Sequence, residues 1–274
     1  MGILNLTPDS FSQDGLIRGG RNVLEHSIHR ALTMIRQGAD ILDVGGESTR
    51  PGAKKISAAE EIQRVIPTIT ALAKKIQIPI SIDTYKTPVA QAALDAGASI
   101  VNNVMGTKPR QSFLKMIRNY GAAIVLMHMR GTPRAMQKNI RYHSLMDDIA
   151  TSLHGAVENC MDIGIKSDKI IIDPGIGFGK TAEHNLEIIH CLRALHALGK
   201  PILIGTSRKS FIGNVLNVKV HQRLWGTAAT VSASIYHGAH IVRVHDVAAM
   251  KQVAVMTDAI LNSKFTNPKP MNQR

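Results

Sequence analysis

The sequence predicts an α/β protein built as a single (β/α)₈ TIM barrel. Three observations support this fold class. Short, continuously apolar segments alternate with amphipathic helical segments along the chain. A Gly-Ala-x-Ile motif stands between a helical and an apolar segment at four places, as expected of a repeated unit. Finally, a barrel of this kind takes roughly 250 residues, which suits a chain of 274.

Eight buried strands are expected, one in each apolar segment. They cover residues 2–6, 40–44, 78–82, 99–101, 122–127, 170–172, 201–204 and 240–244. Continuous rather than alternating apolar runs are typical of parallel strands that are covered on both faces. No Gly-x-Gly-x-x-Gly turn follows the first strand, and this argues against a dinucleotide-binding fold.

The helical segments carry recognisable start and stop signals. Ser57 and Glu60 have the spacing of a capping box at the start of a helix. The glycines of the repeated motif are expected just past the ends of helices, where the chain turns into the next strand. They are Gly38, Gly97, Gly121 and Gly238. No linker-like composition divides the chain, so we expect residues 1–274 to form one domain, with a flexible tail from about residue 263.

The composition narrows the function classes. A net charge of +13 indicates either a solvated basic surface or steering of anionic substrates. Nucleic-acid binding is disfavoured, because the basic residues are spread out and only 4% of residues are aromatic. Cys160 and Cys191 lack a Cys-x-x-Cys spacing, and the chain shows no signal peptide or long apolar run. We therefore expect a cytoplasmic protein with reduced cysteines and no membrane partner.

Polar residues follow nearly every predicted strand. In chain order they are Asn5, Asp43, Glu47, Asp83, Asn102, His128, Asp173, Ser207, Arg208, Lys209, Arg243 and His245. The carboxyl ends of barrel strands carry the chemistry in this architecture, whereas the opposite rim serves stability. A single buried aspartate could simply cap a loop, but so regular a set indicates an active site.

Five motifs at these strand ends resemble the dihydropteroate synthase family, a group of pterin-binding barrels. They are Asn-x-Thr-Pro-Asp-Ser-Phe at 5–11, Gly-Gly-Glu-Ser-Thr-Arg-Pro-Gly at 45–52, Asp-Pro-Gly-x-Gly-Phe-Gly-Lys at 173–180, Ser-Arg-Lys-Ser at 207–210 and Arg-Val-His-Asp-Val at 243–247. The resemblance runs from residue 1 to about 260. It implies a transferase of folate biosynthesis that is a target of sulfonamides and a homodimer, and the apolar outer faces of the last two helices also suggest a dimer.

The family joins 6-hydroxymethyl-7,8-dihydropterin diphosphate to p-aminobenzoate and releases diphosphate. By resemblance, the pterin contacts are Asp83, Asn102, Met127, Asp173 and Lys209. The carboxylate of Asp173 suits the paired donors on the pterin edge. Met127 packs on the ring in this interpretation, although simple filling of the core is the alternative.

The diphosphate is expected at Asn5, Arg243 and His245, since phosphate sites in these barrels lie at the last two loops. Asn5 resembles the family residue that helps to hold Mg²⁺, a cation that keeps waters and takes few protein ligands. His245 could instead cap its own loop. The p-aminobenzoate is expected against Thr49, Arg50, Pro51, Phe178 and Ser210, with the first two loops acting as a lid.

We expect a dissociative substitution at the pterin methylene. Asp83 would stabilise the developing cation, while Arg243, His245 and Mg²⁺ would stabilise the departing diphosphate, and Lys209 completes the catalytic set. The aromatic amine is neutral at pH 7, so no strong general base is needed. Asp43 and Glu47 receive no role beyond ordering the second loop.

Three features depart from the family pattern. Asn103 stands where an Asp is common, residues 12–15 read Ser-Gln-Asp-Gly rather than Ser-Asp-Gly-Gly, and the chain begins directly on the first strand. Without the usual hairpin below the barrel we expect some loss of stability. A methyltetrahydrofolate methyltransferase would share the Asp and Asn contacts but not residues 207–210 or the pair Arg243 and His245. A non-catalytic pterin-binding relative should have lost one of Asp83, Asp173, Lys209 and Arg243, and all four are present.

Overall fold

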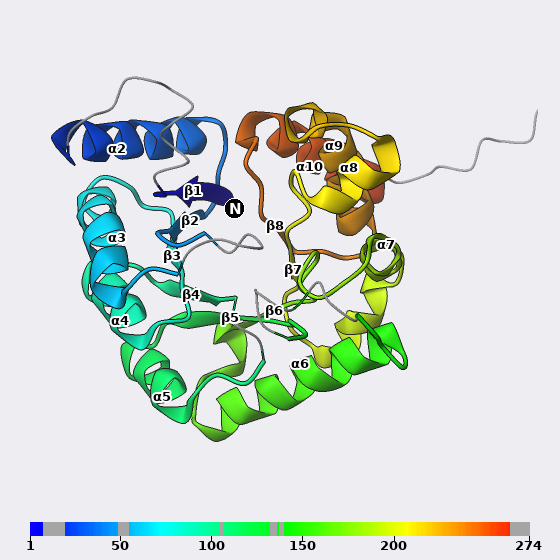
Figure 1. The fold of residues 1–274 in the computed structure, drawn as a ribbon, viewed down its shortest axis with the longest axis horizontal. Coiled ribbons are helices and arrows are strands. Elements are labelled where there is room, and N and C mark those ends of the chain that lie inside the picture. Colours follow the sequence, from blue (N-terminus) through cyan, green and yellow to red (C-terminus); the bar gives the residue numbers. More distant parts are fainter. Residues whose placement is uncertain (8–19, 49–54, 105–106, 132–135, 137–139, 264–274) are drawn as a thin grey trace, which may run out of the picture.

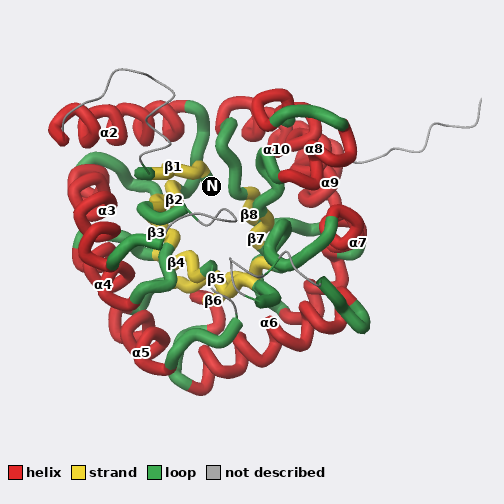
Figure 2. Tube along the Cα trace, in the orientation of Figure 1, coloured by secondary structure: helices red, strands yellow, loops and turns green. Residues whose placement is uncertain are grey.

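The computed structural model describes residues 1–7, 20–48, 55–104, 107–131, 136 and 140–263. Within these residues eight strands form a ring with the helices outside it (Figures 1 and 2). The strands are β1 (Gly2–Asn5), β2 (Leu42–Gly45), β3 (Ile80–Asp83), β4 (Ile100–Asn103), β5 (Ala123–Met127), β6 (Ile170–Asp173), β7 (Leu203–Ile204) and β8 (Ile241–Val242). Each lies within or next to a predicted strand.

All neighbouring strands pair in parallel. Strands β1 to β6 form one sheet in chain order, and β7 pairs with β8. Single bridges complete the ring, from Ile172 to Ile202 and from Gly2 to Val244. The backbone N–H of Ile3 donates to the carbonyl oxygen of Val244 at 3.0 Å, which joins the last strand to the first. The sheet is therefore closed, as the predicted barrel requires.

The helices pack around the outside of the strands (Figure 2). They are α2 (Gly20–Arg36), α3 (Ala58–Ala73), α4 (Thr87–Asp95), α5 (Gln111–Tyr120), α6 (Leu145–Asp162), α7 (Ala182–His190), α8 (Ser210–Leu216), α9 (Leu224–Tyr236) and α10 (Val247–Leu261). Three 3₁₀ turns, η2 (Ser167–Lys169), η3 (Leu192–Leu198) and η4 (Val220–Gln222), complete the regular elements of the described chain. The predicted flexible tail lies outside the described residues from residue 264 onward.

The N-cap at Ser57 and the glycines that follow four helices are confirmed. The Oγ of Ser57 accepts a hydrogen bond from the backbone N–H of Glu60 at 3.1 Å, which caps α3. Positive φ angles occur at the four glycines of the repeated motif, which are +93° at Gly38, +109° at Gly97, +61° at Gly121 and +94° at Gly238. Each glycine thus makes the left-handed turn that leads from a helix into a strand.

The strands divide the apolar residues into two cores. Residues such as Ile80 and Ile82 face the helices, where they join the larger core. A smaller cluster, with Ile100, Val125 and Leu203, fills the inside of the barrel. Side chains alternate along a strand, so Asp83 and Asn102 also point inward. Both lie toward the carboxyl ends of their strands, β3 and β4. The fold therefore directs polar side chains into the mouth of the barrel.

No helix within the described ranges is long and apolar enough to cross a membrane.

Candidate active site

The strand register sets three polar positions at one level of the barrel. Asn5 pairs with Gly45, Gly45 pairs with Asp83, and Asp83 pairs with Asn102. Asn102 in turn pairs with Val125, and Asp173 lies two residues beyond that level, where it pairs with Met127. This alignment explains how residues separated by many positions in the sequence come to face a common space.

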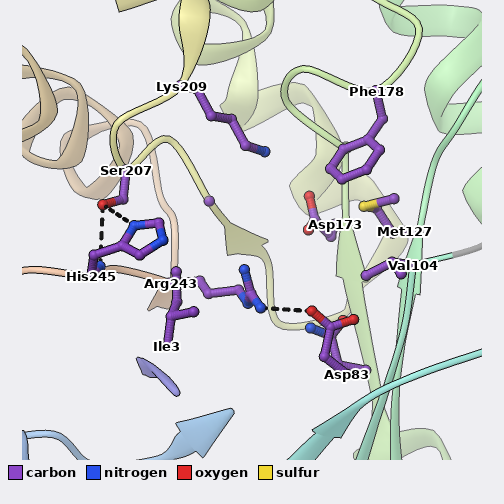
Figure 3. Close-up of a pocket in the computed structure, with 12 residues that line it drawn as sticks. Ile3, Asp83, Val104, Met127, Asp173, Phe178, Ser207, Lys209, Arg243 and His245 are labelled. Carbon is purple, nitrogen blue, oxygen red and sulfur yellow. Dashed lines mark hydrogen bonds and ion pairs between the residues drawn. The ribbon is translucent and has the colours of Figure 1, made fainter. Parts of the chain in front are cut away.

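A pocket opens at this level (Figure 3). Eight of the predicted site residues line it, namely Asp83, Asn102, Met127, Asp173, Phe178, Lys209, Arg243 and His245. Ile3, Val104, Gly205 and Ser207 complete the lining. The structure thus gathers the predicted pterin contacts with the predicted anion ligands of the last strand.

Arg243 is held between two carboxylates at the floor of the pocket. Its Nε donates to Oδ2 of Asp43 at 2.6 Å. Its Nη2 donates to Oδ2 of Asp83 at 2.7 Å (Figure 3). Although burial alone would lower the pKa of Arg243, the carboxylates of Asp43 and Asp83 raise it. The guanidinium therefore stays charged, and its plane is fixed by two ion pairs.

Asp83 and Asn102 each keep an oxygen without a partner. Burial raises the pKa of Asp83, and the positive charge of Arg243 opposes that rise. Among the described residues no group donates to Oδ1 of Asp83 or to Oδ1 of Asn102, although both atoms are buried. Buried acceptors of this kind are uncommon without a ligand or water, so the two oxygens suit a ligand that carries donors.

Asp173 and Lys209 form the opposite wall of the pocket. Oδ1 of Asp173 accepts a hydrogen bond from the backbone N–H of Gly175 at 2.7 Å, and burial raises the pKa of this carboxyl group. Burial lowers the pKa of Lys209 to about 8, against the attraction of Asp173. Nζ of Lys209 donates to the carbonyl oxygen of Ile176 and lies 4.8 Å from the centre of the Phe178 ring.

His245 is oriented by Ser207. The backbone N–H of His245 donates to Oγ of Ser207 at 3.2 Å, and the same Oγ lies 3.0 Å from Nδ1 of the ring (Figure 3). The Oγ of Ser207 can donate to Nδ1 or accept from it, because the roles depend on the tautomer of the ring. In the tautomer that carries its proton on Nε2, His245 can donate to an anion.

The other five predicted site residues are not found in the described lining of the pocket. Thr49, Arg50 and Pro51 lie outside the described residues. Ser210 is the exposed first residue of α8. Asn5 ends β1, and its Oδ1 lies 3.6 Å from the point where a Cβ would stand on Gly45, beside Asp83.

Glu47 and Asp43 do different things. As predicted, Glu47 orders the end of the second loop, because it accepts hydrogen bonds from Tyr85 and Lys86 and from the backbone of Ile56. The same prediction for Asp43 was wrong. Asp43 is fully buried and accepts hydrogen bonds from Arg243 and, at 3.1 Å, from Nδ2 of Asn102.

The sequence thus placed Asp43 and Ser207 among the polar strand-end residues but did not reveal their contacts with Arg243 and His245. Asp43 shares the inward face of β2 with Gly45, and that alternation could have signalled its role. Ser207 belongs to the Ser-Arg-Lys-Ser motif, but nothing in the sequence shows that it contacts His245.

The barrel, the pocket and a family match define the class of the protein. Residues 1–245 match the family model described as pterin binding enzyme, so the chain belongs to the pterin-binding enzymes. A dihydropteroate synthase from Synechocystis is 46% identical to this chain, over 95% of this chain and 89% of that protein. One from Bacillus subtilis is 45% identical, over 96% and 88%. The chain is thus a member of the dihydropteroate synthase family, as the strand-end motifs predicted.

Solved structures agree with this assignment. A Clostridium difficile dihydropteroate synthase, crystallised in the presence of pteroic acid, matches with a TM-score of 0.87 and 45% identity, over 96% of each chain. A Yersinia pestis dihydropteroate synthase in a sulfonamide drug complex matches with a TM-score of 0.89 and 38% identity, over 96% of this chain and 94% of that chain. These matches also support the barrel fold.

Proposed function

We propose that this enzyme condenses 6-hydroxymethyl-7,8-dihydropterin diphosphate with p-aminobenzoate to give 7,8-dihydropteroate and diphosphate. The observation that carries the proposal is the pocket in which Asp173, Asn102 and Lys209 converge beside Arg243 and His245. A methyltetrahydrofolate methyltransferase would have no need for the last two residues. This reaction is a step of folate biosynthesis. Sulfonamides, which resemble p-aminobenzoate, should inhibit the enzyme.

The pterin is expected to lie between Asp173 and Asn102. A carboxylate accepts the paired donors of an amino-pyrimidinone edge in bidentate fashion, and Asp173 presents one within a buried wall. Oδ1 of Asn102 is a buried acceptor without a partner in the described chain, which supports a contact with a ring N–H. Met127 lies beside Asp173 and would pack on the face of the ring (Figure 3).

The departing diphosphate is expected near Arg243 and His245. Arg243 holds a fixed positive charge, and Nε2 of His245 supplies a donor in the tautomer in which the Ser207 hydroxyl donates to Nδ1. Charges that are fixed before the reaction stabilise a developing anion without reorganisation. The carboxylate of Asp83, at 2.7 Å from Arg243, would stabilise positive charge on the pterin methylene as the C–O bond breaks.

Mg²⁺ fits this site as a cation that arrives with the diphosphate. In the described part of the chain no cluster of three or more His, Cys, Asp or Glu side chains could hold a metal by itself. Mg²⁺ often keeps its waters and binds substrate phosphates with one or two protein oxygens. Oδ1 of Asn5 is the oxygen that we expect to hold it, and the ion would neutralise charge on the leaving diphosphate.

The p-aminobenzoate is expected on the outer side of the pterin. Phe178 lines the pocket and offers a ring face, and the Ser210 hydroxyl at the start of α8 can donate to the carboxylate. Thr49, Arg50 and Pro51, which lie outside the described residues, complete this part of the proposal. The predicted lid falls on the first two loops, most of which lie outside the described residues.

Diphosphate release tests the proposal. The enzyme should release diphosphate only when both substrates and Mg²⁺ are present, and Asp173→Asn and Lys209→Ala should each lower the rate strongly. Release that continues unchanged in both variants would refute the site assignment.

Positional isotope exchange tests the dissociative step. With ¹⁸O in the bridging position of the pterin diphosphate and no amine present, reversible ionisation should scramble the label within the bound diphosphate. An absence of scrambling under conditions where cleavage reverses would count against a cation intermediate.

We also propose that the enzyme is a cytoplasmic homodimer. Large apolar side chains stand exposed on α9 and α10, including Trp225 at 79%, Met256 at 62% and Val255 at 58%. Trp225→Ser should shift the protein toward monomer in light scattering, whereas Leu186→Ser on α7 should not. Both cysteines are free thiols, which supports a reducing compartment.

A further inference from the structure

Lys180 is a buried lysine that lies next to the pocket without lining it. Only 3% of its surface is exposed. Its Nζ lies 3.0 Å from Nδ1 of His128, 3.1 Å from the carbonyl oxygen of Phe178 and 3.4 Å from the carbonyl oxygen of His128. A protonated amine has three donors, so these three acceptors use all of them.

The surroundings of this amine are well defined. Burial, reinforced by the charge of Lys180, lowers the pKa of His128 to about 3, so the ring is neutral and Nδ1 can accept. Burial lowers the pKa of Lys180 itself to about 7, and Asp173 opposes that change while Lys209 adds to it. On the far side of His128, the Tyr142 ring contacts the rings of His128 and His184 and the guanidinium of Arg130.

The loop that precedes Lys180, residues 174–179, lies tightly against the end of β5. A Cβ on Gly175 would overlap the carbonyl oxygen of His128, and one on Gly179 would lie 2.5 Å from the carbonyl oxygen of Arg130. Both glycines have positive φ angles. The hydroxyl of Tyr142 also donates to the carbonyl oxygen of Gly179 at 2.9 Å. This close approach is possible only with glycine at these positions.

We propose that Lys180 is a positioning residue for the transfer reaction: through its bonds to His128 and to the Phe178 backbone, it fixes residues 174–179 so that the Phe178 ring forms the wall against which the aromatic amine binds. The inference rests on the proposed function, in which Phe178 contacts p-aminobenzoate. Lys180 acts on substrate only through Phe178, because its donors are already used by protein acceptors.

A buried lysine with neutral partners is a poor choice for stability alone. Removing an amine from water is costly, and its hydrogen bonds mainly offset that cost. Lys180→Met should lower the melting temperature, because the acceptors of His128 and Phe178 lose their donor. Its expected effect on the reaction is a change in how the amine substrate binds.

The test compares Michaelis constants in four proteins, namely wild type, Lys180→Met, Phe178→Ala and the double variant. We expect Lys180→Met to raise KM for p-aminobenzoate about 5- to 20-fold while kcat and pterin affinity change less than about threefold. In the Phe178→Ala background the same change should have almost no further effect, because both changes act on one contact. Effects that multiply in the double variant, or equal losses for both substrates, would overturn the proposal.

Lys200→Met is a matched control. Lys200 is also buried and also donates to a backbone carbonyl, that of Ser167, but Ser167 precedes β6 at the opposite rim. This variant should leave both Michaelis constants unchanged. A rise in KM for p-aminobenzoate in Lys200→Met, equal to that in Lys180→Met, would show a general effect of losing a buried lysine and would overturn the proposal.

Variants of His128 keep the test decisive if Lys180→Met fails to fold. His128→Asn retains an acceptor near the position of Nδ1, whereas His128→Leu removes it. Only the leucine variant should raise KM for p-aminobenzoate, and identical behaviour of the two would contradict the positioning role. If wild type itself releases no diphosphate from the two substrates, the proposed function fails instead, and this is seen before any variant is compared.

Discussion

Two lysines contact the same loop, residues 174–179, and they differ in what surrounds them. Lys209 lines the pocket, lies near the carboxylates of Asp173 and Asp83, and in the described chain makes one hydrogen bond, to Ile176. Lys180 meets three neutral acceptors. A lysine with donors to spare can bind a substrate, whereas a lysine with every donor used can only hold the protein. Burial alone therefore does not identify a substrate-binding cation.

The largest expected difference between the two lysines is in catalytic efficiency. Lys209→Met should lower kcat/KM by about 10²- to 10³-fold, since removing a charged donor from a dry site typically costs about 3–4 kcal/mol. Lys180→Met should lower it by only about tenfold, through the amine substrate. Steady-state kinetics with each substrate varied in turn measures both effects. If both variants lost the same amount of kcat/KM, and lost it equally for both substrates, the proposed difference between Lys209 and Lys180 would be contradicted.

Two glycines of the same loop should separate stability from catalysis. Gly175→Ala combines a positive φ of +72° with a backbone overlap at His128, so we expect a loss of at least about 2 kcal/mol in unfolding free energy. Gly177→Ala should lose about 1 kcal/mol, because its Cβ would meet only the flexible side chain of Lys209 at 3.3 Å. It should instead weaken pterin binding. Chemical denaturation and kinetics of both variants check this, and the reverse order of stabilities would contradict it.

The last expected difference is in the pH dependence of stability. Lys180 has a folded pKa of about 7, below its ordinary value of 10.5, so at pH values between these the unfolded state binds more protons. Wild-type stability should therefore rise with pH relative to Lys180→Met, from about pH 7 and by at most about 1.4 kcal/mol per pH unit.

The corresponding comparison with Lys209→Met should begin to rise one unit higher, because the pKa of Lys209 is about 8. Urea unfolding at pH 7, 8 and 9 measures both differences. A difference that stays constant over this range would show that neither lysine has a lowered pKa.

The fold was predictable because its signals are local. Apolar runs located all eight strands, and the Gly-Ala-x-Ile motifs located four helix ends. The last two strands are shorter than predicted, since only Leu203–Ile204 pairs continuously with Ile241–Val242, and single bridges extend the ring. Such limits depend on the curvature of the closed barrel, which a local pattern does not contain.

The site was predictable only in part. Strand ends correctly indicated Asp83, Asp173 and Arg243 as pocket residues, because parallel strands share one carboxyl edge. The contact between Asp43 and Arg243 joins residues 200 positions apart and depends on the register of the whole ring. The burial of Lys180 was also not predictable, because a lysine after a glycine-rich loop is as easily exposed to solvent as buried. Contacts across the barrel thus needed the structure.

Binding of a pterin without diphosphate is the sharpest test of the pterin pocket. Because Asp173 is the proposed partner of the pterin edge, 6-hydroxymethylpterin should bind Asp173→Asn at least tenfold more weakly than wild type, as measured by isothermal titration calorimetry. Lys180→Met should bind it within about threefold of wild type. Unchanged affinity in Asp173→Asn would contradict the assignment of this pocket to the pterin.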